Sequence, residues 1–267
     1  MGTVKVVYPK YNIVGLNATS RVYSTQPSVS QIPKVLRKAI IPYSGRQFLY
    51  ADLKAAEVYI LVKWAKCYSL IDAYEKGEDL YSVIAKKVLN KDEVTTEERN
   101  TIKAVILSIL YGSEGYSAAR VLHIEEDTAK GLVETFFKVY PEIENFQKTI
   151  HQYILSHGYI ETFFFRPRIL KVLSDDETGI KRQGINTAIQ GTCADCLKIC
   201  LGALDNKDIR FVTSVFDSVL LEVHNSMTKE QARDFLSDFF SKCPPFKFRF
   251  EFGLGSNWGE AQENMEH

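Results

Sequence analysis

The strand-like patterns of this chain lie toward its two ends, and a long stretch of helical pattern separates them. Residues 64–158 repeat apolar side chains at helical spacing. Apolar or alternating runs typical of strands occur at Val4–Tyr8, Phe48–Ala51, Tyr159–Phe165, Arg210–Val223 and Phe246–Phe252. The economical arrangement is an α+β fold, in which both ends of the chain build one mixed or antiparallel sheet and a helical subdomain is inserted between them.

The clearest helix boundaries lie around residues 95–112. Thr95 and Glu98 form a capping-box pattern, and Gly112 stands where a left-handed C′ residue is expected. We therefore expect a helix from about Thr96 to Tyr111. Further helices are predicted over Asp79–Leu89, Glu125–Val139, Pro141–His157, Lys181–Leu204 and Thr228–Phe240.

Charge is unevenly distributed, although the formal net charge is +0. Residues 1–46 contain no Asp or Glu, but they contain Lys5, Lys10, Arg21, Lys34, Arg37, Lys38 and Arg46. Such a segment indicates contact with a polyanion, or a basic surface that only aids solubility. The sequence shows no apolar run that could span a bilayer and no secretory leader, so we expect no membrane partner.

The cysteines favour a reducing compartment, because the chain has five of them, an odd number. We expect a cytoplasmic protein of a bacterial cell or a phage-infected bacterial host. Cys193, Cys196 and Cys200 repeat on one helix face and could be metal ligands or buried small side chains. With no second CxxC and no nearby His, the pattern favours burial.

Two isolated acids stand beside predicted strands. Asp52 follows Phe48–Ala51 where strand pattern gives way to helix pattern, and Asp217 lies at the tip of a hairpin predicted within Arg210–Val223. Asp52 alone also suits an exposed turn or an N-cap. If the two strands are neighbours in one sheet, the carboxylates meet at one edge, where a divalent metal would relieve their repulsion. Oxygen ligands favour Mg²⁺, and two such ions would suit an in-line phosphoryl displacement.

A row of side chains recurs every four residues along the helix predicted from Thr96. The row is Arg99, Lys103, Leu107 and Tyr111. Cations near the positive end of a helix dipole are disfavoured unless an anion binds there. The row is typical of a track for a nucleoside triphosphate, with cations for the phosphates and an apolar and aromatic surface for sugar and base. The alternative is a solvated face on which Glu97 balances Arg99 and Glu98 balances Lys103.

Several short motifs stand in a fixed order along the chain. They are ATSRVYSTQPSVSQIP (Ala18–Pro33), DLKAAE (Asp52–Glu57), RNTIKAVILSILYG (Arg99–Gly112), GYIETFFFRPR (Gly158–Arg168), RQGINTAIQGTCADCLK (Arg182–Lys198), SVFDS (Ser214–Ser218) and GSNWGEA (Gly255–Ala261). In this order they resemble the motifs of the A-family DNA polymerases, the bacterial DNA polymerase I type. The resemblance implies a palm over residues 1–63 and 159–267, helical fingers over residues 64–158, and neither a thumb nor an exonuclease domain.

The function that this resemblance implies is template-directed addition of deoxynucleotides from dNTPs to a primer 3′ end, with release of pyrophosphate. Asp52 and Asp217 would hold two Mg²⁺ ions, or Mn²⁺ in their place, with the Leu53 carbonyl as a further ligand. Lys103 would also act as a general acid toward the pyrophosphate. Nucleotide contacts are implied for Arg99, Lys103, Leu107, Tyr111, Glu57 and Leu53. Contacts to primer-template DNA are implied for Arg21, Arg168, Arg182, Asn186 and Gln190.

Individual positions refine this expectation. Glu57 matches the family's steric gate, which would block a ribose 2′-OH. The family usually has an aromatic residue at Leu107 and often a His at Tyr81. It also has a His at Phe216 and a Glu at Ser218, so a primer-end hydrogen bond and an auxiliary carboxylate are missing here. These departures bear on rate and fidelity. Without a thumb, we expect low processivity or a protein partner that supplies grip on the duplex.

Three alternatives remain open at this point. A non-catalytic, polymerase-derived module that binds primer-template or nucleotide is made more plausible by Ser218, which lacks the usual carboxylate. Against it stand four retained residues, Asp52, Asp217, Arg99 and Lys103. A single-subunit RNA polymerase is disfavoured by Glu57 and by the motif over Arg182–Lys198. A two-metal nuclease would use paired acids but would have no need of the triphosphate helix.

Overall fold

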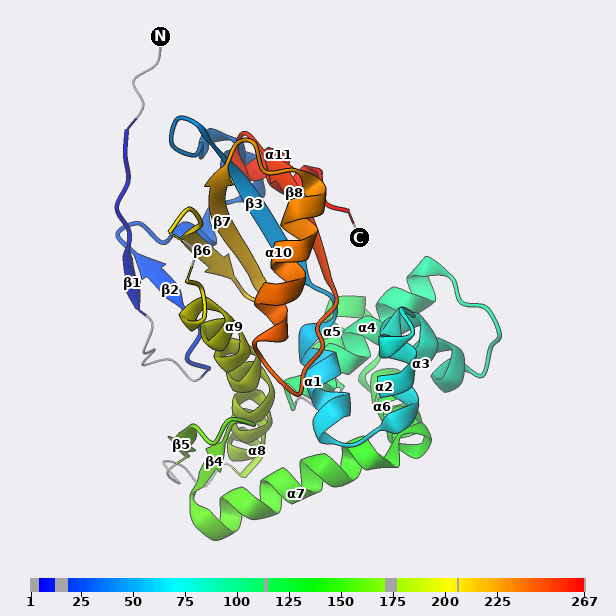
Figure 1. Cartoon of the computed structure of the whole chain (residues 1–267). Coiled ribbons are helices and arrows are strands. Elements are labelled where there is room, and N and C mark those ends of the chain that lie inside the picture. The colour runs from blue at the N-terminus through cyan, green and yellow to red at the C-terminus, as the bar shows by residue number, and fades with distance from the viewer. Residues whose placement is uncertain (1–4, 13–18, 113–114, 171–176, 206, 267) are drawn as a thin grey trace. The chain divides into compact units, whose positions relative to one another are not determined.

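The structure, a computed structural model, describes residues 5–12, 19–112, 115–170, 177–205 and 207–266. The chain forms two compact units: unit 1 is Met1–Lys54 with Ala194–His267, and unit 2 is Ala55–Cys193. Unit 1 holds an antiparallel sheet, and unit 2, inserted between its two segments, is mainly helical (Figure 1). The α+β fold class is therefore confirmed. The palm and fingers boundaries expected from the sequence, at 63/64 and 158/159, stay predictions.

A four-stranded sheet in the order β6-β7-β3-β8 forms the centre of unit 1. The inner strand β3 (Arg46–Leu53) is antiparallel both to β7 (Ser218–His224) and to β8 (Phe250–Gly255), and β6 (Arg210–Val215) forms a hairpin with β7. The other elements of this unit are β1 (Lys10–Asn12), β2 (Tyr23–Thr25), the 3₁₀ helices η1 (Val29–Gln31) and η2 (Lys34–Ala39), α10 (Lys229–Ser241), α11 (Trp258–Glu263) and most of α9 (Thr192–Gly202).

The two faces of this sheet bury different partners, because side chains alternate along each strand. On one face, Phe48 and Tyr50 of β3 cluster with Trp258 of α11. On the other face, the Phe240 ring of α10 lies against Phe250 of β8, with centroids 5.4 Å apart. Figure 1 shows α10 crossing in front of the sheet. Asp52, two residues after Tyr50, lies on the α11 face.

Two strand predictions require correction. Residues 5–8, the described part of the strand predicted over Val4–Tyr8, form no strand, and the short strand of this segment is β1 (Lys10–Asn12). The apolar side chains of Val6, Val7 and Tyr8 are more than half exposed, so this run does not enter the core. The last strand was predicted over Phe246–Phe252 and begins at Phe250 instead. The rings of Phe246 and Phe248 stack with centroids 5.6 Å apart, and this run of alternating apolar residues packs outside the ladder.

Unit 2 consists of helices and one small hairpin. The helices are α1 (Ala56–Trp64), α2 (Tyr68–Glu75), α3 (Leu80–Leu89), α4 (Thr96–Leu110), α5 (Tyr116–Leu122), α6 (Glu126–Val139), α7 (Pro141–His157) and α8 (Glu177–Asn186); the strands are β4 (Tyr159–Glu161) and β5 (Pro167–Ile169). The capping box is present at α4: Glu98 N–H donates to Thr95 Oγ1 at 3.2 Å, and Thr95 N–H donates to Glu98 Oε2 at 2.8 Å. Gly112 follows in the left-handed conformation, with φ +63°.

The long helix predicted over Lys181–Leu204 is interrupted. A π-helical turn, η3 (Thr187–Gly191), separates α8 from α9. The β4–β5 hairpin bonds to this region: Phe163 N–H donates to Thr192 Oγ1 at 2.8 Å, and Arg166 Nη2 donates to the Gly191 carbonyl at 3.3 Å. Contacts from a distant segment of the chain accompany the irregular turn, and apolar periodicity along one helix does not reveal them.

The described residues include neither a membrane-spanning helix nor a cluster of metal ligands. Among their helices, none has the length and apolar character needed to cross a bilayer. Cys193, Cys196 and Cys200 are buried, as the sequence favoured, and no group of three or more His, Cys, Asp or Glu side chains among the described residues is arranged to hold a metal ion.

Candidate functional site

The register of β3 and β7 brings the two isolated acids together in unit 1. Asp52 of β3 pairs with Ser218 of β7, and Asp217 is the residue directly before Ser218. Leu53 N–H donates to the Asp217 carbonyl oxygen at 3.4 Å. Both acidic side chains are half-buried. Two carboxylates so placed repel one another, and a cation would relieve that repulsion.

Asp52 is not the cap of the helix that follows it. It lies within β3, whereas α1 begins at Ala56 with Ala55 as its N-cap at φ 48°. The N-cap alternative for Asp52 is therefore wrong, because three residues, 53–55, separate Asp52 from the first residue of the helix. The Leu53 side chain is buried at the end of the strand.

Tyr50 is a neighbour of the acids that the sequence reasoning missed. It precedes Asp52 by two residues, so both side chains lie on one face of β3. Burial raises the pKa of Tyr50; the hydrogen bond with Ser218 opposes this, while the negative charges of Asp52 and Asp217 raise the pKa further. The phenol therefore stays protonated beside the carboxylates. Period-two alternation along β3 was the signal that could have found it.

A third carboxylate lies opposite Asp52 on the other neighbouring strand. Glu251 of β8 is the register partner of Asp52. Lys54 Nζ forms an ion pair with Glu251 Oε1 at 2.8 Å. Only the pairing of β3 with β8 reveals this contact, so it could not be predicted from the sequence. The ion pair with Lys54 therefore lies directly beside Asp52 in the sheet.

The donor set at this edge fits Mg²⁺. Magnesium sites of phosphoryl-transfer proteins commonly use one or two carboxylates together with substrate phosphates, rather than an all-protein cage. Two half-buried carboxylates beside strand-end backbone carbonyls are the matching protein contribution.

Arg21 lies beside the same hairpin tip. Its guanidinium carbon is 5.0 Å from the ring centroid of Phe216. Phe216 has φ 58°, in the left-handed region, and is 69% exposed. The residue that replaces the family's His thus presents an open ring beside Asp217, and Arg21 contacts that ring.

Part of the basic N-terminal segment has internal partners. Arg37 is buried, and its Cζ lies 4.3 Å from the centroid of the Trp258 ring. Arg37 Nη1 also donates to Gln262 Oε1 at 2.9 Å. Lys38 Nζ forms an ion pair with Glu263 at 2.7 Å. The count of unbalanced cations therefore overstated the charge that this segment offers to a polyanion.

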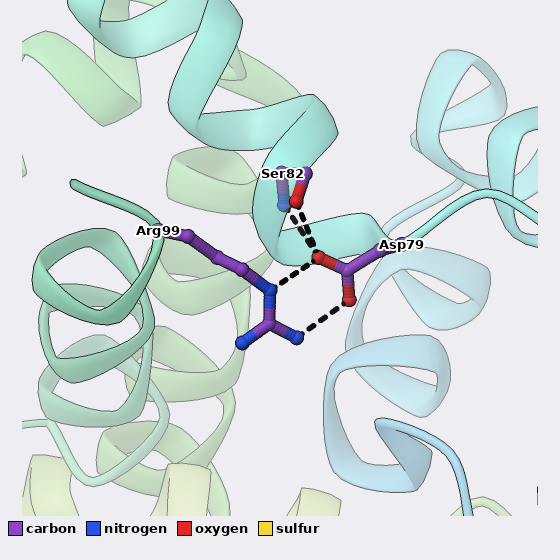
Figure 2. Close-up of polar contacts among 3 residues, drawn as sticks. All are labelled: Asp79, Ser82 and Arg99. Carbon is purple, nitrogen blue, oxygen red and sulfur yellow. Dashed lines mark hydrogen bonds and ion pairs between the residues drawn. The ribbon is translucent and has the colours of Figure 1, made fainter. Parts of the chain in front are cut away.

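The cation row lies on α4 in unit 2. Lys103 is exposed, Leu107 is half-buried and Tyr111 is 39% exposed. The local charge balance that formed the alternative is not what the structure shows. Arg99 instead forms an ion pair with Asp79, with Nε to Oδ2 at 2.6 Å (Figure 2). Glu98 pairs with Lys91 and closes the capping box.

The far end of α4 meets α8 in a small pocket. The pocket, of about 270 Å³, is lined by Tyr111, Gly179, Arg182, Gln183 and Asn186. Asn186 Oδ1 is buried and accepts no hydrogen bond from the described residues. A side chain at Gly112 would begin 2.9 Å from the Arg182 Cα, so glycine permits the close approach that places Tyr111 beside Arg182.

The remaining predicted residues of unit 2 are placed separately. Glu57 is half-buried in the first turn of α1, and Gln190 is buried in η3. Arg168 donates from Nη1 to Thr187 Oγ1 at 2.6 Å and from Nη2 to Gln183 Oε1 at 3.0 Å. Burial, together with the charge of Arg166, lowers the pKa of Arg168. Arg168 thus braces the α8–η3 segment.

Comparison with known proteins gives consistent similarities. A sequence model described as DNA polymerase family A matches residues 3–260. The chain is 30% identical over 267 residues to DNA polymerase I of Borreliella burgdorferi, covering 91% of this chain and 29% of that protein. It is 29% identical over 247 residues to DNA polymerase I of Streptococcus pneumoniae, covering 85% and 28%. The chain thus spans under a third of the length of these relatives.

A solved structure shows the same likeness. It is the POL domain of Pol1 from M. smegmatis in complex with DNA primer-template and dNTP. The TM-score is 0.86 at 25% sequence identity, and the match covers 95% of this chain and 48% of that chain.

Proposed function

Because the chain belongs to DNA polymerase family A, we propose that it is a template-directed DNA polymerase. In this proposal it adds deoxynucleotides to a primer 3′ end and releases pyrophosphate. The observation that carries the proposal is the sheet register that sets Asp52 beside Asp217. A relative solved with primer-template and dNTP supports DNA and nucleotide as partners of this chain too.

In the proposed reaction, Asp52 and Asp217 hold two Mg²⁺ ions, with the Leu53 carbonyl as an additional ligand. Bound there, the ions would supply charge stabilisation to the attacking and leaving oxygens of an in-line displacement. The carboxylates fix the site for this charge, and Tyr50 keeps its proton at their side. Ser218 Oγ donates to the Val215 carbonyl at 2.8 Å, so it ties the hairpin tip that carries Asp217.

The α4 row binds the triphosphate in this proposal. Arg99 and Lys103 contact phosphate oxygens, and the Lys103 ammonium gives a proton to the pyrophosphate as it leaves. Leu107 and Tyr111 present apolar and aromatic surface to the incoming or templating base. The smaller Leu107 offers less stacking surface than an aromatic residue would.

Sugar and template selection complete the proposal. Glu57 blocks a ribose 2′-OH, so deoxynucleotides are preferred. Arg182 and Asn186 contact the template-primer at the pocket beside Tyr111. There Asn186 Oδ1, which has no hydrogen bond from the described residues, would accept one from the nucleic acid. Further DNA contacts are proposed for Arg21, Arg168 and Gln190. Arg168 would have to share its guanidinium with Thr187 and Gln183.

We also propose low processivity, or a protein partner that adds grip on the duplex, and a location in the cytoplasm of a bacterial cell or a phage-infected bacterial host. Phosphate contacts from the basic N-terminal segment would then carry part of the DNA affinity. Such contacts release counterions, so DNA binding should weaken steeply as salt rises. A flat salt dependence would contradict this part of the proposal.

Primer extension tests the proposed function. Extension with Mg²⁺ is measured with dNTPs and with NTPs, for the wild type and for Asp217→Ala. We expect extension by the wild type with dNTPs, much less with NTPs, and none by the variant. An inactive wild type that still binds primer-template would favour the non-catalytic module. Equal use of NTPs would point to an RNA polymerase, and an active variant would refute the metal assignment.

A further inference from the structure

The start of α3 holds the two cations of α4. Asp79 is the N-cap of α3, and its carboxylate forms a fork with Arg99. Arg99 Nε donates to Asp79 Oδ2 at 2.6 Å, and Arg99 Nη2 donates to Oδ1 at 2.8 Å (Figure 2). Two parallel charge-assisted hydrogen bonds fix the plane of the guanidinium as well as its position.

Asp79 is itself fixed by the helix that it caps. Its Oδ2 accepts hydrogen bonds from Ser82 N–H at 2.9 Å and from Ser82 Oγ at 2.6 Å. Partial burial would raise the pKa of Asp79, but the hydrogen bonds from Arg99 and Ser82 and the charge of Arg99 outweigh it and lower the pKa to about 2. The carboxylate is therefore ionised at neutral pH and presents a rigid acceptor pair to Arg99.

Tyr81, in the same turn, contacts both cations. The Arg99 Cζ and the Lys103 Nζ each lie 5.3 Å from the centroid of its ring, and Tyr81 is buried. A cation over an aromatic face is attracted to it. Tyr81, at the position where the family often has a His, thus gives Arg99 and Lys103 one shared aromatic contact.

The fork leaves one side of the guanidinium unused. Asp79 takes Nε and Nη2, while Arg99 Nη1 has no hydrogen bond among the described residues, and Figure 2 shows it directed away from Asp79. A guanidinium held along one edge can still donate from its other edge to a phosphate. Since its orientation is set beforehand, less side-chain freedom is lost when the ligand binds.

We propose that Asp79 is a positioning residue for the nucleotide: it holds Arg99 so that Nη1 faces the triphosphate, beside a Lys103 that Tyr81 supports. The inference deepens the proposed function and rests on it. Asp79 itself touches no substrate. Its loss should therefore weaken nucleotide affinity and leave the chemical step nearly unchanged.

The test uses Asp79→Asn, which keeps an N-cap acceptor for Ser82 but cannot form the charged fork. We expect the KM for dNTPs to rise about tenfold, with kcat within about twofold of wild type and a thermal transition lowered by no more than about 4 °C. Glu144→Gln is the matched control: it removes a carboxylate from an ion pair with Lys148 at 2.7 Å on α7 of the same unit. Its KM should stay at the wild-type value.

A double-mutant cycle with Arg99→Gln isolates the contact. If Asp79 acts through Arg99, Asp79→Asn adds no further rise in KM in the Arg99→Gln background. A full additional tenfold rise there, or an unchanged or lower KM in Asp79→Asn alone, would overturn the inference. Mg-dATP binding to the complex with a dideoxy-terminated primer-template gives the same comparison without turnover. A wild type that fails to extend primers but shows this binding pattern would refute the polymerase proposal alone.

Discussion

The acids of unit 1 and the cations of unit 2 are held by different kinds of interaction. Asp52 and Asp217 are neighbours because the β3–β7 ladder sets their register, and backbone hydrogen bonds maintain that ladder. Arg99 and Lys103 depend on two side chains of α3, Asp79 and Tyr81. A single side-chain substitution can therefore change the positions of Arg99 and Lys103, whereas Asp52 and Asp217 stay adjacent unless the sheet itself changes.

The largest effect is expected at Lys103, where one exposed side chain is proposed to supply a proton. Lys103→Met should lower kcat about 10²- to 10⁴-fold, the range of a lost general acid. Single-turnover primer extension at saturating dNTP measures this. Lys148→Met removes an exposed lysine from α7 and should change the rate by less than twofold. A similar small change in Lys103→Met would contradict the assigned role.

A backbone change sharpens the contrast from the other side. Gly112→Ala forces a Cβ into the left-handed region at φ +63° and to within 2.9 Å of the Arg182 Cα. We expect the free energy of unfolding to fall by about 2–3 kcal/mol, and the pocket beside Tyr111 to be distorted.

Gly131→Ala is the matched control for that substitution. No atom lies within 4 Å of a Cβ added at Gly131, in the interior of α6, so the free energy of unfolding should rise by about 0.5–1 kcal/mol. Urea unfolding followed by circular dichroism compares the two variants. Equal shifts in both would show that the Gly112 contact is unimportant.

Sugar selection should depend on a single carboxylate at the start of unit 2. Glu57→Ala should reduce the preference for dNTPs over NTPs in kcat/KM about tenfold, because the barrier to the 2′-OH is removed. Glu134→Ala, an exposed position on α6, should leave the preference unchanged. A preference that survives in Glu57→Ala would assign the discrimination to another residue.

The smallest effect concerns acid stability. The pKa of Asp79 is about 2 when folded, below its usual 3.8, so its stabilising contribution is complete above about pH 4 and is lost as pH falls from 4 to 2. Because Asp79 is partly exposed, we expect no more than about 1 kcal/mol. Urea midpoints between pH 5 and pH 2 should fall less steeply in Asp79→Asn than in the wild type. Parallel curves would argue against a strong fork in solution.

The sequence predicted elements whose signals are local. Thr95, Glu98 and Gly112 bound α4 because caps depend only on nearby backbone groups. The hairpin that carries Asp217 and the buried strand before Asp52 could be predicted for the same reason. Their adjacency was a conditional prediction, since it required β3 and β7 to be neighbours, and the structure shows that they are.

Features that depend on contacts between distant segments could not be predicted. The Asp79–Arg99 fork requires α3 to pack on α4, and near-neighbour reasoning assigned Arg99 to Glu97 instead. The π turn η3 accompanies bonds from the β4–β5 hairpin. The run Val4–Tyr8 looked like a strand because composition does not show that its side chains stay exposed.

The central claim is that Asp52 and Asp217 hold the metal ions of the proposed reaction. Electron paramagnetic resonance of Mn²⁺, with a dideoxy-terminated primer-template and dNTP present, tests it without turnover. We predict protein-bound Mn²⁺ in the wild type and in the control Asp238→Asn, whose exposed acid pairs with Lys242 on α10, and its loss in Asp52→Asn/Asp217→Asn. The same bound Mn²⁺ signal in the double variant would contradict the claim.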